Sequence, residues 1–199
     1  MPWEHYILSK FQRIPKNPPR GAFHGPYSNL MFSLFPPESD FDVAPRFKWG
    51  PYPSPYFRFD ILFDRKTVLM LELKRPGDLQ YSSKRQEAIR EIQRRIKNLR
   101  RQHYIVAIFF FFTSLTASDS IAECPPPVLH AVSAFGTKLC FCQGYCNQPM
   151  QPSSFLAHPE GVMDLAPQEY WDCDILEEEG EKRFKSMIEE IKRGCAALR

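Results

Sequence analysis

The chain has 199 residues, a length that suits one domain with a substantial core and leaves little room for two. Aromatic residues make up 14% of it, including 17 phenylalanines, and this composition excludes a disordered chain. The net charge of +3 is too small to point to a class of partner by itself.

The first 25 residues are expected to form an N-terminal extension. A short helix is predicted over Trp3–Phe11, and the prolines that follow at 15, 18 and 19 preclude regular structure. Because proline is tolerated in a first helical turn, a second helix is predicted over Pro26–Leu34. Phe41–Phe47 is predicted to be the first strand, and Pro45 places it at a sheet edge or gives it a bulge.

Residues 56–74 predict two strands joined by a tight, charged turn. Successive side chains of a strand alternate between its two faces, so Glu72 and Lys74 point the same way, away from the leucines beside them. If the turn lies at Arg65-Lys66, Asp60 is paired with Glu72 on the neighbouring strand. Asp64 is interpreted as a turn residue. Three charged side chains are therefore expected to meet on one face of an otherwise apolar sheet.

Two neighbouring carboxylates with an ammonium beside them suit a hard divalent cation and an activated water. On this interpretation Asp60 and Glu72 hold the cation and Lys74 orients the water. The alternative is a surface hairpin in which Lys74 pairs with either carboxylate across the strands. The residues alone leave both interpretations open.

A helix is predicted from Ser82 or Ser83 to about Gln102, with a narrow apolar stripe at helical spacing. Between Lys84 and Arg101 there are eight Lys or Arg residues and two Glu. This face is either a solvated surface or a surface that contacts phosphates. The candidate nucleic-acid contacts are Lys84, Arg85, Arg90, Arg94, Arg95 and Lys97.

The apolar segment Ile105–Leu115 is predicted to be a central strand covered on both faces. Val128–Cys142 is predicted to form a strand pair that turns near Gly136-Thr137. The expected core thus spans residues 26–143, followed by an irregular connection over 144–173. The C-terminal segment 174–199 is predicted to be a helix packed on the core, running from about Ile175 to Leu198 with a capping box that starts at Asp174.

Six cysteines without a recognisable signal peptide favour reduced thiols and an intracellular, nuclear or cytoplasmic location. Cys140, Cys142 and Cys146 lack the paired spacing of structural zinc sites and are expected to be buried or edge thiols. The longest apolar run, Tyr104–Phe112, is too short to cross a bilayer as a helix, so no membrane association is expected.

The pattern Asp60-x11-Glu72-x-Lys74 on consecutive strands, followed by a basic helix and an apolar strand, resembles the restriction-endonuclease-like, or PD-(D/E)xK, nuclease superfamily. Phe59 stands before Asp60, so the Pro-Asp dipeptide of that pattern is absent. The chain also resembles a group of uncharacterised fungal proteins in several stretches, among them Leu71–Pro76, Ser133–Phe141 and Trp171–Gly180. This second resemblance implies no established activity.

The nuclease resemblance implies a single α/β (α+β) domain, in which a central mixed sheet is flanked by helices. It implies hydrolysis of phosphodiester bonds in nucleic acid, DNA being expected ahead of RNA, with Mg²⁺ or Mn²⁺ as cofactor. Asp60 and Glu72 would be metal ligands, the backbone carbonyl of Leu73 would complete the shell, and Lys74 would assist the attacking water. The alternative is a non-catalytic module on the same scaffold that binds nucleic acid or a protein.

Overall fold

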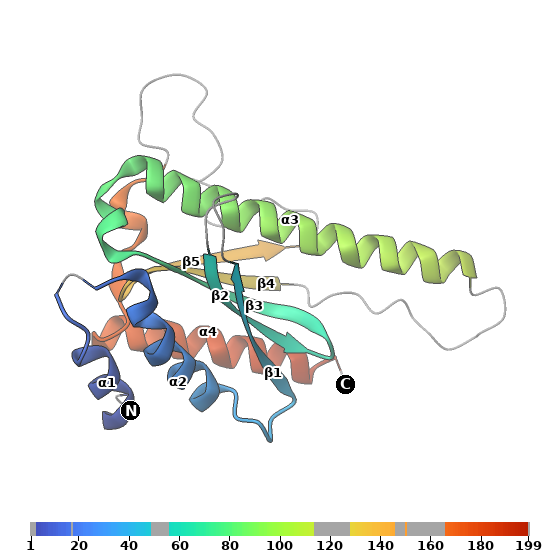
Figure 1. Cartoon of the computed structure of the whole chain (residues 1–199). Coiled ribbons are helices and arrows are strands. Elements are labelled where there is room, and N and C mark those ends of the chain that lie inside the picture. Colours follow the sequence, from blue (N-terminus) through green and yellow to red (C-terminus); the bar gives the residue numbers. More distant parts are fainter. Residues whose placement is uncertain are drawn as a thin grey trace.

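The computed structural model describes residues 3–16, 18–48, 56–113, 128–145, 150 and 166–198. These residues form an α+β architecture built on a six-stranded mixed β-sheet. Helix α3 covers one face of the sheet, whereas α1, α2 and α4 pack on the other face (Figure 1). The predicted fold class, a mixed sheet flanked by helices with a C-terminal helix packed on it, is confirmed.

The six strands lie side by side in the order of the sequence. Strands β3 and β4 are parallel, and every other neighbouring pair is antiparallel. The strands are β1 Phe41–Lys48, β2 Tyr56–Phe63, β3 Lys66–Lys74, β4 Val128–Phe135, β5 Lys138–Tyr145 and β6 Cys173–Asp174. The predicted strand at Phe41–Phe47 is confirmed as β1, whose position at the sheet edge explains why Pro45 is tolerated.

A parallel pair needs a long crossover, and here the crossover contains the 3-10 helix η2, Pro76–Gln80, and α3, Ser82–Thr113. The predicted start of α3 at Ser82 is confirmed. The predicted strand at 105–115 is wrong, because residues up to Thr113 continue the helix. No glycine or proline interrupts 82–113, so helix propagation is favoured, and a short apolar run does not by itself distinguish a strand from a helix. The strand that follows this helix and pairs with β3 is therefore β4.

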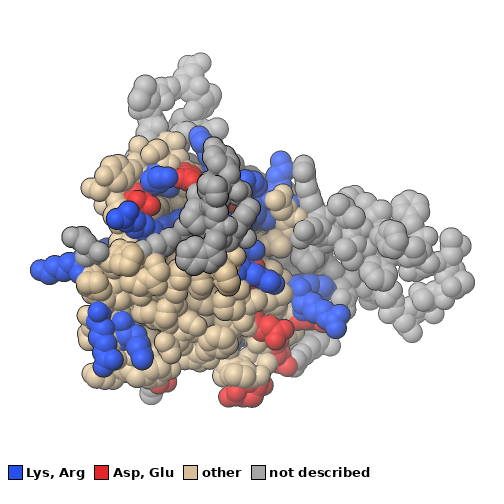
Figure 2. Space-filling view, viewed as in Figure 1, with Lys and Arg blue, Asp and Glu red and all other residues tan. Residues whose placement is uncertain are grey.

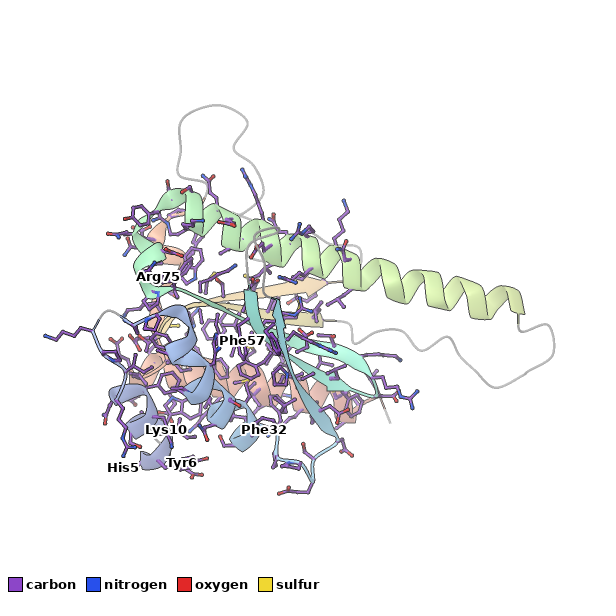
Figure 3. All side chains as sticks on the ribbon, in the orientation of Figure 1. His5, Tyr6, Lys10, Phe32, Phe57 and Arg75 are labelled. Carbon is purple, nitrogen blue, oxygen red and sulfur yellow. The ribbon has the colours of Figure 1, made fainter. Side chains whose placement is uncertain are left out.

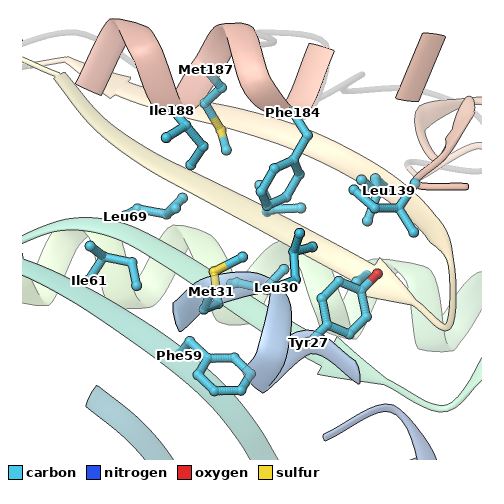
Figure 4. Packing of buried hydrophobic residues seen from close by; sticks show 14 of the residues in the cluster. Tyr27, Leu30, Met31, Phe59, Ile61, Leu69, Leu139, Phe184, Met187 and Ile188 are labelled. Atoms are coloured by element: carbon cyan, nitrogen blue, oxygen red, sulfur yellow. The ribbon is translucent and has the colours of Figure 1, made fainter. Parts of the chain in front are cut away.

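The larger core lies between the sheet and α1 His5–Gln12, α2 His24–Leu34 and α4 Glu178–Ala196. The 3-10 helices η1, Arg20–Phe23, and η4, Gln168–Tyr170, lead into α2 and β6. Side chains from α2, β2, β3, β5 and α4 meet there, among them Tyr27, Phe59 and Phe184 (Figure 4). Tyr6 and Phe32 lie on the outer side of this layer and are partly exposed (Figure 3). The predicted N-terminal and C-terminal helices are thus confirmed.

The predicted capping box at Asp174 is wrong. Helix α4 begins at Glu178, and its N-cap residue, Glu177, makes no side-chain capping hydrogen bond. Asp174 instead accepts hydrogen bonds from the Thr137 hydroxyl, at 2.7 Å, and from the backbone N–H of Leu176, at 3.0 Å. Its carboxylate therefore ties the β4–β5 turn to the segment before α4, and the predicted turn at Gly136-Thr137 is confirmed.

The thiols of Cys140 and Cys142 are buried and free, as the sequence predicts, whereas Cys146 lies outside the described residues. The predicted irregular segments also lie largely outside them. Among the helices of the described chain, none combines the length and the apolar character needed to cross a membrane.

Two glycines of α4 test how closely this helix is packed. A Cβ at Gly180 would lie 1.9 Å from the backbone oxygen of Asp174, whereas a Cβ at Gly194 meets nothing within 4 Å. We expect Gly180→Ala to lower the free energy of unfolding by at least about 2 kcal/mol, because backbone must move. Gly194→Ala should raise it by about 0.5–1 kcal/mol through helix propensity.

Urea denaturation of both variants measures the two effects in one helix. Equal stability of Gly180→Ala and the unmodified protein would show that α4 does not approach Asp174 this closely.

Candidate functional site

The β2–β3 hairpin turns at Asp64-Arg65, one residue earlier than the position on which the predicted pairing was based. Both residues have positive φ, 47° and 61°, as a two-residue type I′ turn requires. Asp64 is thus confirmed as a turn residue. The register shifts once more between Ile61 and Leu62. Asp60 therefore lies opposite Met70, and the predicted pairing of Asp60 with Glu72 is wrong.

Asp60, Glu72 and Lys74 nevertheless share one face of the sheet. Arg58 lies opposite Glu72, and Asp60 follows Arg58 by two residues, which returns it to the same face. Met70, the cross-strand neighbour of Asp60, packs in the apolar cluster formed with α3. The three charged side chains therefore lie on the α3 side of the sheet, with Asp60 displaced diagonally from Glu72.

Glu72 is the most deeply buried charged residue of this face, with 1% of its surface exposed. Lys74 Nζ donates a hydrogen bond to Glu72 Oε1 at 2.9 Å. Arg95 Nε lies 3.6 Å from Glu72 Oε2, which accepts no hydrogen bond within the described residues. Burial by itself would raise the pKa of Glu72, but the Lys74 ammonium, a hydrogen bond with Glu91 and the Arg95 guanidinium lower this pKa to about 2.

Glu91 of α3 completes this cluster. The Lys74 ammonium donates to its carboxylate as well, so one cation bridges Glu72 and Glu91. Burial raises the pKa of Glu91, as do its hydrogen bond with Glu72 and the charge of Glu72, against the opposing effect of Lys74. A carboxylate that ionises readily thus lies beside one that holds its proton, a consequence of placing two like charges in one partly buried site.

Asp60 belongs to a separate ion-pair group. Its carboxylate accepts two hydrogen bonds from Arg58, at 2.7 and 2.9 Å, and lies 3.6 Å from Arg46 Nε on β1. Lys74 pairs with Glu72 and Glu91 and not with Asp60. The structure therefore brings together two of the three predicted catalytic residues, Glu72 and Lys74, and pairs Asp60 with Arg58 and Arg46 instead.

Leu73 lies between Glu72 and Lys74, with its side chain buried in the core on the opposite face of the sheet. The role of its carbonyl as a metal ligand stays a prediction. Within the described residues, no three His, Cys, Asp or Glu side chains come together as a set that could hold a metal ion. The two carboxylates that the Lys74 ammonium bridges are those of Glu72 and Glu91.

The six predicted nucleic-acid contacts of α3 divide into two groups. Arg85 is 5% exposed and donates to the carbonyl oxygens of Ala166 and Leu79, so its guanidinium group is directed into the protein. Arg95 turns inward, towards Glu72. The exposed members are Lys84, Arg90, Arg94 and Lys97. Basic side chains lie in the upper half of Figure 2, where α3 runs, with acidic ones among them.

Sequence reasoning did not assign a role to Glu91. The available signal was its place on the helix: Glu91 and Arg95 are four residues apart and so share one helix face, directly beside the apolar stripe at Ile92 and Ile96. An acid that flanks the buried stripe of an otherwise basic helix is placed to meet the sheet.

Comparison of the chain with protein-family models, with curated proteins and with solved structures finds no match in any of the three. The nuclease resemblance stays a prediction, and the geometry of the Glu72–Lys74–Glu91–Arg95 cluster is the basis for a functional proposal.

Glu91→Gln tests the proton sharing in this cluster. The folded state raises the pKa of Glu91 above its usual value of 4.5, so the stabilising contribution of Glu91 is complete below that value and is lost as pH rises through the higher one. The glutamine of the variant does not titrate, so the variant has no such contribution to lose as pH rises. We therefore expect the difference in Tm, variant minus unmodified protein, to increase between about pH 4 and about pH 8.

Glu87→Gln is the matched control, because Glu87 lies one turn earlier on α3 and pairs with Lys84 at the surface. A Tm difference for Glu91→Gln that does not increase with pH, relative to that of the control, would contradict this account of the cluster.

Proposed function

We propose that the chain is a phosphodiesterase that acts on nucleic acid, with Mg²⁺ or Mn²⁺ as cofactor and DNA as the expected substrate. One observation carries the proposal. Glu72 is buried and ionised, yet its Oε2 accepts no hydrogen bond within the described residues, and a second carboxylate lies beside it. Leaving a buried acceptor unsatisfied costs about 1–3 kcal/mol, and more when it is charged.

The residues present fit a divalent cation. Carboxylate oxygens are the ligands that Mg²⁺ prefers, and one or two of them, with substrate phosphate oxygens, make up many of its sites. The Lys74 ammonium already bridges Glu72 and Glu91, so a positive charge suits this position. Glu72 and Glu91 would hold the cation, and Asp60 and the carbonyl of Leu73 stay the predicted further ligands. A bound divalent cation lowers the pKa of water and offsets charge on a phosphate.

The remaining charged groups would serve the substrate. Lys74 would orient the attacking water and offset the negative charge that develops on the phosphate. Arg46, whose side chain is 54% exposed, and Arg58 would contact the nucleic-acid backbone. The attacking water forms the new P–O bond, the bond to the leaving nucleotide oxygen breaks, and the proton that the water loses ends on that leaving oxygen.

Cleavage of labelled single-stranded and double-stranded DNA and RNA, with Mg²⁺, Mn²⁺ or a chelator, tests the proposal. We expect metal-dependent cutting that Glu72→Gln and Lys74→Met each reduce by at least about a hundredfold, because each removes a group that stabilises the transition state. Asp64→Asn, in the exposed hairpin turn, should leave the rate unchanged. Substrate that stays intact at micromolar enzyme with either metal would contradict the proposal.

A second candidate is a non-catalytic nucleic-acid-binding module. It is favoured by the ion pairs of Asp60 with Arg58 and of Glu72 with Lys74, which neutralise both carboxylates without a metal. The exposed Arg90 and Arg94 would then provide the binding surface.

For this candidate we expect binding without cutting. Charge reversal at Arg90 and Arg94 should weaken binding and flatten its dependence on salt, because fewer counterions are released. Lys182→Glu, an exposed position of α4 on the other side of the sheet, is the matched control. Fluorescence anisotropy measures both effects, and an absence of binding at low salt would exclude nucleic acid as the partner.

A further inference from the structure

The opposite face of the sheet holds a cavity that the proposed phosphodiesterase does not use. Its volume is about 420 Å³, within the range of small-molecule sites. Residues of β4, β5 and α4 line it: His130, Phe141, Cys142, Gln143, Arg183, Ser186, Met187 and Glu190. Leu129 and Ala131 pack with α3, so the alternation of the strand turns His130 towards α4.

One wall of the cavity is apolar. Phe141 of β5 and Met187 of α4 face each other across the layer between sheet and helix, and both belong to or pack against the larger core. Met187 points from α4 towards the sheet beside Ile188 (Figure 4). An apolar wall of this kind favours the binding of an aromatic or aliphatic group, because the apolar surface of that group is removed from water.

His130 forms the polar floor, with 3% of its surface exposed. Its Nδ1 has no hydrogen-bond partner within the described residues, and its Nε2 lies 4.0 Å from Glu190 Oε1, too far for a hydrogen bond. Burial lowers the pKa of His130, against the opposing effect of Glu190, so the imidazole is neutral near pH 7. A neutral imidazole offers one acceptor nitrogen and does not repel a cation.

Among the described residues that line the cavity, Glu190 carries the one charge that no charged partner compensates. Arg183 Nη1 donates to Asp172 at 2.7 Å, and the Arg183 guanidinium lies over the Phe141 ring, 4.9 Å from its centroid. Glu190, by contrast, has His130 as its ion-pair partner among the described residues, and that imidazole is neutral. The lining is therefore net negative at the Glu190 end.

We propose that this cavity binds a small organic cation, a protonated amine carried on an aromatic or aliphatic body. The ammonium group lies between Glu190 and His130, donating to the carboxylate and to the imidazole acceptor. The apolar body packs on Phe141 and Met187. These four residues lie on the opposite side of the sheet from Glu72, so the site is independent of the phosphodiester chemistry.

NMR titration of the full chain with 2-phenylethylamine tests the proposal. We expect saturable shifts of the signals of His130 and Met187. 3-Phenylpropionate keeps the aromatic body but reverses the charge, and ethylamine keeps the charge but lacks the aromatic body. Both should bind at least about tenfold more weakly, because each loses one of the two interactions.

Glu190→Gln should weaken the binding of the amine by about tenfold, because the hydrogen bond from the ammonium group to a charged carboxylate becomes one to a neutral amide. Glu189→Gln is the matched control, since Glu189 is the next residue of α4 and pairs with Lys192 at the surface. Glu72→Gln should leave amine binding unchanged, which separates this site from the phosphodiesterase proposal. Equal binding of the amine to Glu190→Gln, tighter binding of the carboxylate, or no saturable shift at millimolar amine would overturn the inference.

Discussion

The burial of the Glu72 carboxylate between β3 and α3 is the constraint on which the candidate site depends. A carboxylate that loses its water must be paired, because an isolated buried charge costs several kcal/mol. Lys74 reaches it from the same strand, whereas Glu91 and Arg95 reach it from the helix. The charge of Glu72 on β3 therefore helps to determine which side of α3 faces the sheet.

The alternation of side chains along the strands gives the sheet two chemically different faces. The face under α1, α2 and α4 is built from large apolar residues such as Phe59 and Leu71. The face under α3 has a smaller apolar cluster and places charged groups from β2 and β3 beside it. Polar chemistry is therefore concentrated on the α3 side, and the cavity at His130 is the corresponding polar feature on the α4 side.

Much of this arrangement follows from the sequence. The strict alternation around Glu72 and Lys74 was enough to predict the hairpin and to place both charges on one face. The register was not predictable to one residue, because a turn at Asp64-Arg65 with two left-handed residues competes with its neighbours, and a bulge adds a further shift.

The helix was harder to predict than the hairpin. Residues 105–113 are apolar without a distinctive period, so their helical state depended on the helix that precedes them. Whether Glu91 or another helix residue meets β3 is decided by tertiary packing, which local sequence does not encode. Arg85 illustrates the same limit, because its carbonyl partners come from Leu79 and the distant Ala166.

The central claim is that Glu72 and Glu91 form a binding site for a divalent cation. Calorimetric titration with Mn²⁺ and Mg²⁺ tests it most directly. The account predicts saturable binding of either metal to the unmodified protein and the loss of this binding in Glu72→Gln. An absence of saturable heat at millimolar metal, or an unchanged titration in that variant, would contradict it.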